Sequence, residues 1–257
     1  MPDDLVTRLR AAGCVFAEDE AALLREQAAD DEQLEVLARR RVGGEPLEQV
    51  LGWALFRGRR MVVAPGVFVP RTRTGLLVDL GAALVHPGDL VLDLCCGVGT
   101  IGAALARTVP GIEVHAVDVD PAAVRCATAN LGPSGTTYIG DLDTPLPPGL
   151  LGRFALLVAN APYVPTEAIA RMPPEARDHE ARGALDGGPD GLDVQRRVVA
   201  AANRWLRPGG ALVVETSRPQ APRTLALFTA AGFAARVAHD DDVDGTAVVG
   251  RHRRPTE

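Results

Sequence analysis

The feature that most constrains the fold of this chain is the segment from Asp89 to Gly102. An apolar run, Leu90–Leu94, is followed by Cys-Cys-Gly-Val-Gly-Thr and then by a helix-like stretch. A strand, a glycine-rich turn and a helix in this order are typical of an open α/β sheet, and glycines let the backbone turn sharply and approach a ligand closely. Gly97, Gly99 and Gly102 also fit the loose pattern Gly-x-Gly-x-x-Gly, which on its own suggests a dinucleotide.

Four strand-like runs in succession each deliver a polar side chain at their end. These side chains are Asp93, Asp118, Asp141 and Asn160. In an open α/β sheet, ligands bind at the carboxyl ends of the strands, so the four are expected around one site. Asp118 lies about 20 residues past the glycines, the spacing expected of a carboxylate that binds ribose hydroxyls. An Asp at a strand end can simply cap the next helix, but capping does not explain the ordered set of four.

The stretch Asn160-Ala161-Pro162-Tyr163 follows the apolar run Phe154–Ala159 and indicates a site that holds a planar amide or amine. The Asn160 side-chain oxygen and the Ala161 carbonyl are two acceptors, which together can bind both hydrogens of one NH2 group. Pro162 stiffens the turn, and Tyr163 offers a ring face to a flat group. Asn and Pro are also ordinary turn residues, so a strand-ending turn without chemistry is the alternative.

Together these motifs resemble those of class I S-adenosylmethionine-dependent methyltransferases and, more specifically, the release-factor glutamine N5-methyltransferase family. The motif order is Asp-x-x-x-Gly-x-Gly, Val-Asp-x-x-Pro, Gly-Asp-Leu and Asn-x-Pro-Tyr. The similarity covers most of the chain, from about residue 40 to residue 251. Beyond these motifs it includes Gly44–Gly52, Phe68–Thr74, Glu180–Leu192, Val214-Glu215 and Gln220. The linker and the Ala-Leu-x-Gly-Gly pattern are more specific than the glycine turn, which many methyltransferases share.

The resemblance implies a Rossmann-like α/β domain with a mostly parallel sheet, a C-terminal antiparallel hairpin and a small N-terminal helical domain. It implies methyl transfer from S-adenosylmethionine to the side-chain amide nitrogen of a glutamine in a protein, with a peptide chain release factor as the expected partner. Asp93 is expected to attract the methionine ammonium, and no metal is expected. The implied catalytic residues are Asn160, Ala161, Pro162 and Tyr163. The implied cofactor-binding residues are Asp93, Cys95, Gly97, Gly99, Thr100, Asp118, Val119, Asp141, Leu142 and Asn160.

The chain departs from the family pattern at several positions, which suggests a divergent paralogue. Ala161 replaces the first proline of Asn-Pro-Pro-Tyr, so the carbonyl is kept but rigidity is lost. Cys95 replaces the first glycine of the turn, which is acceptable only if Cys95 keeps φ below zero. Leu142 stands where an aromatic residue often lies beside adenine, and Thr72–Gly75 stands where the family tends to have Pro-Glu-Thr-Glu. These changes affect the expected identity of the substrate protein more than the expected chemistry.

The expected chemistry needs alignment and no proton-transfer residue. An amide nitrogen is a poor nucleophile, but near-attack alignment at ~3–3.5 Å removes much of the barrier. Two acceptors on the NH2 group also favour positive charge that develops on the nitrogen. His115 and His179 are therefore interpreted as bystanders.

Composition indicates a cytoplasmic enzyme without a membrane segment. The net charge of −6 lowers the expectation of a nucleic-acid partner, and the arginine clusters are short. Four cysteines without paired spacing indicate reduced thiols. No apolar run approaches the ~18 residues of a membrane span, and the N-terminus lacks a signal pattern.

The chain is expected to divide into a helical domain over residues 1–52, a linker with a β-hairpin over 53–73, and the methyltransferase domain over 74–257. Apolar residues recur at helical spacing in the first part, which is expected to help dock the protein substrate. Later helices are predicted near 74–84, 101–108, 121–130, 194–206 and 222–231. Strands near 211–215, 234–239 and 246–251 complete the sheet, and the last two form a hairpin. Asp240–Gly245 resembles the start of a calcium loop but lacks the last acidic ligand, so an exposed hairpin turn is predicted.

Three alternatives remain open. The same clamp fits the exocyclic amine of a nucleic-acid base, on which Tyr163 would stack. A regulator that binds the cofactor without catalysis is the second alternative, because Ala161 departs from the family motif. A dehydrogenase is the third, disfavoured by Asp93 and by the absence of an evident hydride-transfer acid.

Overall fold

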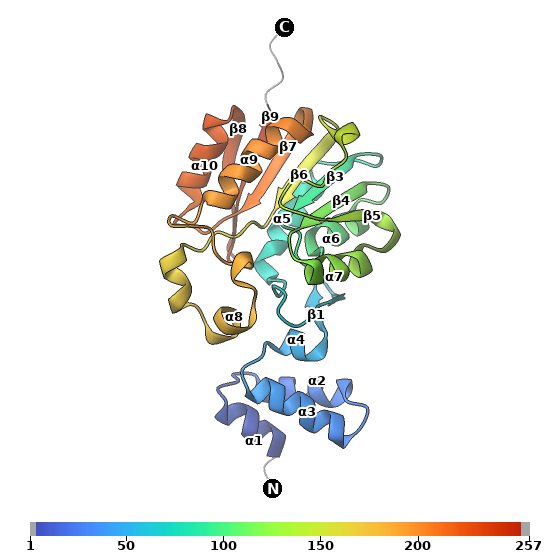
Figure 1. Ribbon diagram of the computed structural model, residues 1–257, viewed down its shortest axis with the longest axis vertical. Coiled ribbons are helices and arrows are strands. Elements are labelled where there is room, and N and C mark those ends of the chain that lie inside the picture. The colour runs from blue at the N-terminus through green and yellow to red at the C-terminus, as the bar shows by residue number, and fades with distance from the viewer. Residues whose placement is uncertain (1–3, 253–257) are drawn as a thin grey trace.

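The computed structural model describes residues 4–252, and a seven-stranded sheet with helices on both faces forms its centre (Figure 1). The strands are β3 (Leu90–Leu94), β4 (Glu113–Asp118), β5 (Gly135–Ile139), β6 (Phe154–Ala159), β7 (Leu206–Glu215), β8 (Phe233–Asp240) and β9 (Gly245–His252). The helices around them are α5 (Gly75–Ala82), α6 (Thr100–Thr108), α7 (Pro121–Leu131), α9 (Asp193–Trp205) and α10 (Ala221–Ala230).

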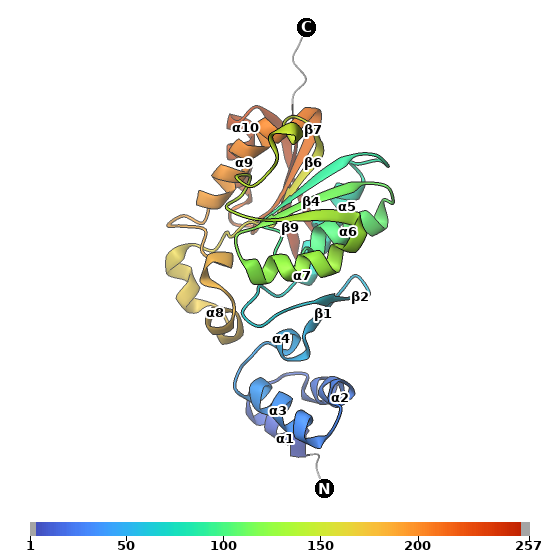
Figure 2. The ribbon, with the colours of Figure 1, turned by 45° about the vertical axis from the view of Figure 1, so that its right-hand side comes forward.

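The strand order is β5-β4-β3-β6-β7-β9-β8. The neighbours among β5, β4, β3, β6 and β7 are parallel, whereas β9 is antiparallel to both β7 and β8. The apolar runs are continuous because both faces of the central strands are buried. Val91 packs on the face that α5, α6 and α7 cover, whereas Leu92 and Leu94 pack on the face that α9 and α10 cover (Figure 2). The predicted fold class, a mostly parallel sheet with a C-terminal antiparallel hairpin, is confirmed.

The predicted helices correspond to α5, α6, α7, α9 and α10, with ends shifted by one or two residues. The predicted hairpin is β8 and β9, and the acidic segment between them is a turn flanked by strands, as expected. One strand start was wrong, because β7 begins at Leu206 and not at Ala211. A register shift explains the difference: Phe154 pairs with Leu206 and Leu156 with Ala211, so β7 bulges through Pro-Gly-Gly between these pairs.

Four helices precede the sheet and pack around a hydrophobic cluster of their own, which includes Leu9, Leu24 and Leu37. They are α1 (Asp4–Ala11), α2 (Ala17–Gln27), α3 (Asp31–Val42) and α4 (Leu47–Leu51). A hairpin follows, formed by β1 (Trp53–Phe56) and β2 (Arg59–Val62). The helical pattern and the hairpin of the sequence are therefore present, while the limits of the domains stay a prediction.

The chain between β6 and α9 has little regular structure and was not assigned from the sequence. It contains the 3-10 helices η4 (Thr166–Arg171) and η5 (Arg182–Ala184) and the short helix α8 (Pro174–His179). Its two ends are joined, because the Val164 amide donates to the Leu185 carbonyl (3.1 Å) and the Gly187 amide to the Val164 carbonyl (2.9 Å). No helix within residues 4–252 is long and apolar enough to cross a membrane.

Candidate functional site

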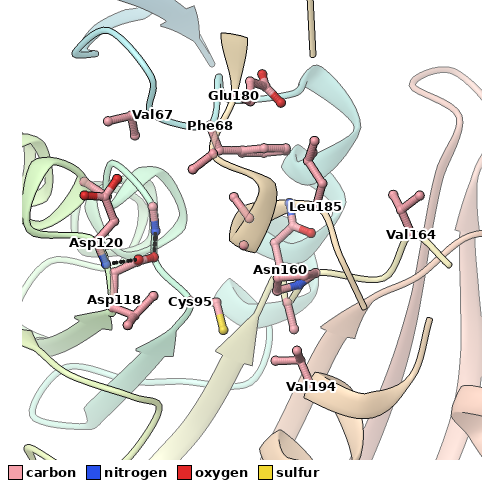
Figure 3. A pocket seen from close by; sticks show the side chains of 18 of the residues that line it. Val67, Phe68, Cys95, Asp118, Asp120, Asn160, Val164, Glu180, Leu185 and Val194 are labelled. Carbon is pink, nitrogen blue, oxygen red and sulfur yellow. Dashed lines mark hydrogen bonds between the residues drawn. The ribbon is translucent and has the colours of Figure 1, made fainter. Parts of the chain in front are cut away.

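A cavity of about 590 Å³ lies at the carboxyl ends of the parallel strands (Figure 3). Sheet register explains its position. Leu94 pairs with Val117 of β4 and with Ala159 of β6, so Cys95, Asp118 and Asn160 emerge side by side. The volume falls within the roughly 300–1,000 Å³ of small-molecule sites.

The cavity brings together most of the residues predicted for the site. Those that line it are Cys95, Gly97, Asp118, Val119, Asp141, Leu142, Asn160, Ala161, Pro162 and Tyr163. Thr100 lines a smaller pocket, which shares Cys95, Gly97 and Asn160 with the cavity. Asp93 and Gly99 line neither. Gly99 instead lies at the start of α6, where an added Cβ would meet the backbone of Ala127 in α7 at 3.0 Å.

Asp118 braces the glycine turn. Its Oδ2 accepts from the Gly97 amide (2.8 Å), and its Oδ1 accepts from the Asp120 amide (3.0 Å). Burial raises the pKa of Asp118, and these backbone donors oppose that rise. Helix capping falls to another residue, because Asp120 accepts from the Ala122 amide at the start of α7 (2.8 Å). Each carboxylate oxygen of Asp118 keeps a further lone pair for a hydroxyl donor.

Asp93 lies under the turn and is fully buried. Its Oδ2 accepts from the Gly102 amide (2.9 Å), whereas its Oδ1 is buried without a hydrogen-bond partner. Burial raises the pKa of Asp93 to about 7. A buried acceptor without a partner is costly, so a cationic or donor group near this oxygen is favoured, although Asp93 itself lines neither the cavity nor the smaller pocket.

The backbone of Cys95 contradicts an expectation. A negative φ was expected, but φ is +55°. The turn keeps the left-handed conformation for which the family uses glycine, because the strand register fixes Leu94 on one side and the Gly97 amide must still reach Asp118 on the other. Leu142 also has a positive φ, of 51°.

The Asn160–Tyr163 segment lines the cavity, and it holds two acceptors without a hydrogen-bond partner, of which the carbonyl of Ala161 belongs to a fully buried residue. The Asn160 Nδ2 group donates to Thr74 Oγ1 (3.3 Å), which leaves Oδ1 on the other side of the amide. Within residues 4–252, neither Asn160 Oδ1 nor the Ala161 carbonyl accepts a hydrogen bond. The Tyr163 hydroxyl accepts from Arg73 Nη2 (3.0 Å), and it donates to Glu215 Oε1 (3.5 Å).

The Ala-Leu-x-Gly-Gly-x-Asp-Gly segment supports this clamp from behind. Gln220 Nε2 donates to the Tyr163 carbonyl (2.8 Å), and Gly191 lies directly against both groups. A side chain at position 191 would occupy their space, which explains why glycine is needed there.

Several residues of the site were not among those predicted from the sequence. They line the cavity or connect to its lining: Phe68, Arg71, Arg73, Thr74, Glu180, Arg197 and Glu215. Arg71 Nη2 donates to Glu180 Oε1 (2.6 Å), and Arg197 Nη2 to Asp141 Oδ2 (2.7 Å). The Phe68–Thr74 and Val214-Glu215 stretches carried a signal as motifs, but nothing in the sequence placed them next to Asn160.

Other predicted features are located as follows. The two ring nitrogens of His115 lie within hydrogen-bond distance of Tyr138 (2.9 Å) and Glu113 (3.1 Å), and His115 does not line the cavity. The four cysteines are free thiols. In the described part of the chain, no cluster of His, Cys, Asp or Glu could hold a metal ion. The arrangement is therefore suited to binding a ligand with hydroxyl and cationic groups beside an NH2 group.

The sequence of this chain is similar to those of known proteins. Residues 61–180 match the family described as "Methyltransferase small domain". The release factor glutamine methyltransferase of Geobacter sulfurreducens is 40% identical to this chain, over 77% of this chain and 69% of that protein. The chain belongs to the release factor glutamine methyltransferase family. The resemblance predicted from the motifs is thereby confirmed.

Relatives of the release factor glutamine methyltransferase family differ in their named substrates. The 4-amino-L-phenylalanine/4-methylamino-L-phenylalanine methyltransferase of Streptomyces pristinaespiralis is 39% identical over 76% of this chain and 68% of that protein. Among solved structures, the 16S rRNA N2 G1207 methyltransferase of T. Thermophilus, bound to AdoMet and guanosine, has a TM-score of 0.57. It is 24% identical over 78% of this chain and 50% of that chain, so this likeness concerns the fold alone.

Proposed function

We propose that this protein transfers a methyl group from S-adenosylmethionine to the side-chain amide nitrogen of a glutamine in a peptide chain release factor. The observation that carries the proposal is the pair of free acceptors, Asn160 Oδ1 and the Ala161 carbonyl, in the cavity wall. Membership of the release factor glutamine methyltransferase family supports the substrate.

The residues of the glycine-turn side fit S-adenosylmethionine. Asp118 offers carboxylate lone pairs to ribose hydroxyls, while Val119 and Leu142 offer apolar contact to the adenine. The unpartnered Asp93 Oδ1 supplies negative charge under the turn, where the methionine ammonium is expected. When bound, the cofactor supplies an electrophilic methyl group on its sulfonium.

The protein's own contribution is alignment. Asn160 Oδ1 and the Ala161 carbonyl each accept one hydrogen of the substrate NH2, which fixes its plane and aims the nitrogen lone pair. Both acceptors also stabilise the positive charge that grows on nitrogen as the new bond forms, and the methylated nitrogen then releases one proton to water to give the neutral amide. Pro162 and the ring of Tyr163 line the cavity next to this position and hold the flat amide.

We further propose that the N-terminal helices help to dock the release factor. Pro46 and Glu48, at the start of α4, line the cavity, so this region reaches the mouth of the site. Gln49 Nε2 donates to the carbonyls of Val67 (2.9 Å) and His179 (3.1 Å), which ties α4 to the cavity wall. The free thiols support a cytoplasmic setting, where release factors act.

The direct test is transfer of labelled methyl from S-adenosylmethionine to purified release factor, followed by peptide mass mapping. Total RNA, total DNA and 4-amino-L-phenylalanine serve as parallel acceptors. One methyl on a release-factor glutamine supports the proposal. Label in nucleic acid would show that the clamp holds a base, and label in the amino acid would show an aryl amine as substrate. No label in any acceptor would favour a cofactor-binding protein without turnover.

Replacing Asn160 with Ala tests the clamp. Loss of one preorganised hydrogen-bonding group from such a site lowers kcat by about 10²–10³-fold, so transfer to the release factor should nearly vanish. Affinity for S-adenosylmethionine, measured by calorimetry, should stay largely intact because Asp118 and the glycine turn are unchanged. Turnover equal to that of the wild type would show that Asn160 does not hold the substrate.

A further inference from the structure

A chain of hydrogen bonds links Asn160 to two residues behind the cavity. Ala159 pairs with Val214, so Asn160 and Glu215 follow side by side at the ends of β6 and β7. Thr74, at the end of the 3-10 helix η1 (Thr72–Thr74), lies between them. Glu215 is fully buried and Thr74 nearly so. Thr74 Oγ1 lies 2.6 Å from Glu215 Oε2 and 3.3 Å from Asn160 Nδ2.

The direction of each hydrogen bond follows from the count of hydrogens. An ionised carboxylate only accepts, so the single hydroxyl hydrogen of Thr74 goes to Glu215. Only lone pairs are then left on Thr74 Oγ1. Asn160 must turn its NH2 group towards Thr74, and its Oδ1 therefore turns away from Thr74. The opposite rotamer would place two oxygens with no hydrogen between them.

The charge on Glu215 is what sets this direction. Burial raises the pKa of Glu215, and Arg73 opposes the rise, because its Nε donates to Glu215 Oε1 (3.2 Å). The groups that face the Glu215 carboxylate are Arg73, Thr74 and the Tyr163 hydroxyl, all of which donate to it. Arg73 thus occupies the Oε1 side, and the Oε2 side is left for Thr74.

We propose that Thr74 and Glu215 are positioning residues that hold the Asn160 amide with its oxygen towards the substrate nitrogen. The inference rests on the proposed function, because only an amide or amine substrate needs an acceptor at this point. An inverted Asn160 would present two hydrogens to the substrate NH2 and would repel it.

Glu215→Gln gives the sharpest test. Arg73 holds the Gln oxygen on the Oε1 side, so the Gln NH2 faces Thr74 and donates to it. Thr74 then donates to Asn160 Oδ1, and the Asn160 amide inverts. We expect kcat to fall by about 100-fold, the effect of losing one oriented group, with unchanged affinity for S-adenosylmethionine. Thr74→Val removes the link without inverting Asn160, so its kcat should fall only about 10-fold. Thr74→Ser restores the hydroxyl and should recover most of that loss.

The double variant Thr74→Val/Glu215→Gln separates orientation from mere packing. Without the hydroxyl, the Gln side chain cannot invert Asn160. The double variant should therefore be several-fold more active than Glu215→Gln alone, whereas two packing defects would make it less active than either single variant. A lower activity of the double variant, or wild-type kcat in Glu215→Gln, would overturn the proposal.

A second measurement needs no substrate. The Asn160 Nδ2 hydrogens, identified by their absence from the NMR spectrum of Asn160→Ala, should exchange slowly with water in the wild type and in Thr74→Ser. They should exchange faster in Thr74→Val and in Glu215→Gln, where no acceptor holds them. Equal exchange rates in all four proteins would show that Thr74 and Glu215 do not hold the Asn160 amide. If the wild type fails to label a release factor, the proposed substrate is wrong. The exchange rates still decide whether Thr74 and Glu215 orient the Asn160 amide.

Discussion

Cys95 places a side chain where the backbone is left-handed, with φ of +55°. This conformation costs an L-residue about 1–2 kcal/mol, and glycine avoids that cost but loses about 0.5–1 kcal/mol of chain entropy. Cys95→Gly should therefore be more stable than Cys95→Ala by about 1 kcal/mol, because both lack the thiol and only Ala keeps the strain. Urea denaturation of the two variants checks this prediction, and a more stable Ala variant would show that the turn is not strained.

Asp93 makes stability depend on pH. Its pKa is raised to about 7 in the folded protein, from about 3.9 in an unfolded chain. Because the folded state keeps the proton longer, the stability contributed by Asp93 is full below about pH 4 and is lost as the pH rises through about 7. Without cofactor, the stability of Asp93→Asn relative to the wild type should rise by about 2–3 kcal/mol between pH 5 and pH 8.5, most of it below about pH 7. Urea denaturation at pH 5 and pH 8.5 gives the difference in free energy of unfolding between the variant and the wild type. An equal difference at both pH values would show that Asp93 is not buried as a charged group.

Gly191 shows how one element supports another. It has a φ of +75°, and a Cβ there would overlap Gln220 Nε2 and the Tyr163 carbonyl. Gly191→Ala should therefore lose about 2 kcal/mol or more, from overpacking and strain, and should lower kcat because Tyr163 shifts. Gly152→Ala is the matched control, since Gly152 also has a positive φ, of +67°, but no atom lies within 4 Å of its added Cβ. The denaturation midpoint and the methyl-transfer activity are measured for both variants. Equal stability of the two variants would show that Gly191 does not support Tyr163.

Among the elements of the fold, those with a regular hydrophobic pattern were predicted from the sequence, and the irregular segments were not. The sheet was predictable because buried parallel strands appear as apolar runs, and a polar residue such as Asp118 or Asn160 marks each end. The segment from Val164 to Leu192 has no such period, because short 3-10 turns are held by backbone contacts to distant residues. The sequence likewise did not place Thr74 and Glu215 next to Asn160: strand register brings Glu215 beside it, and a tertiary contact from the 3-10 helix η1 brings Thr74.

Across the whole molecule, the N-terminal helices meet the catalytic part at few polar contacts. Figure 2 shows them at one end, below the sheet and near α8. The Arg41 guanidinium, at the end of α3, joins the two parts: it donates to Glu20 within the helices (2.6 Å) and to Glu175 in α8 (2.6 Å). A contact between residues so far apart in the chain leaves no local signal, so the sequence predicted a helical unit but not how it is attached.

This attachment can be tested at Arg41. Its side chain is 8% exposed and that of Glu20 is 11% exposed, so Arg41→Met leaves a buried carboxylate unpaired and should cost about 3 kcal/mol. Replacing both residues, as in Glu20→Leu/Arg41→Met, should recover most of that loss, because an apolar pair carries no buried charge. Glu175→Gln should cost under about 1 kcal/mol, because Glu175 is half exposed.

The same variants separate docking from catalysis. If the helices dock the release factor, Arg41→Met should raise KM for the intact release factor by about tenfold, while kcat and KM for a short glutamine peptide change by less than about twofold. Glu20→Leu/Arg41→Met should keep the raised KM for the intact protein, since it restores the stability of the helices but still lacks the contact with Glu175. An equal rise of KM for protein and peptide would mean that Arg41 shapes the cavity itself and that the N-terminal helices have no docking role of their own.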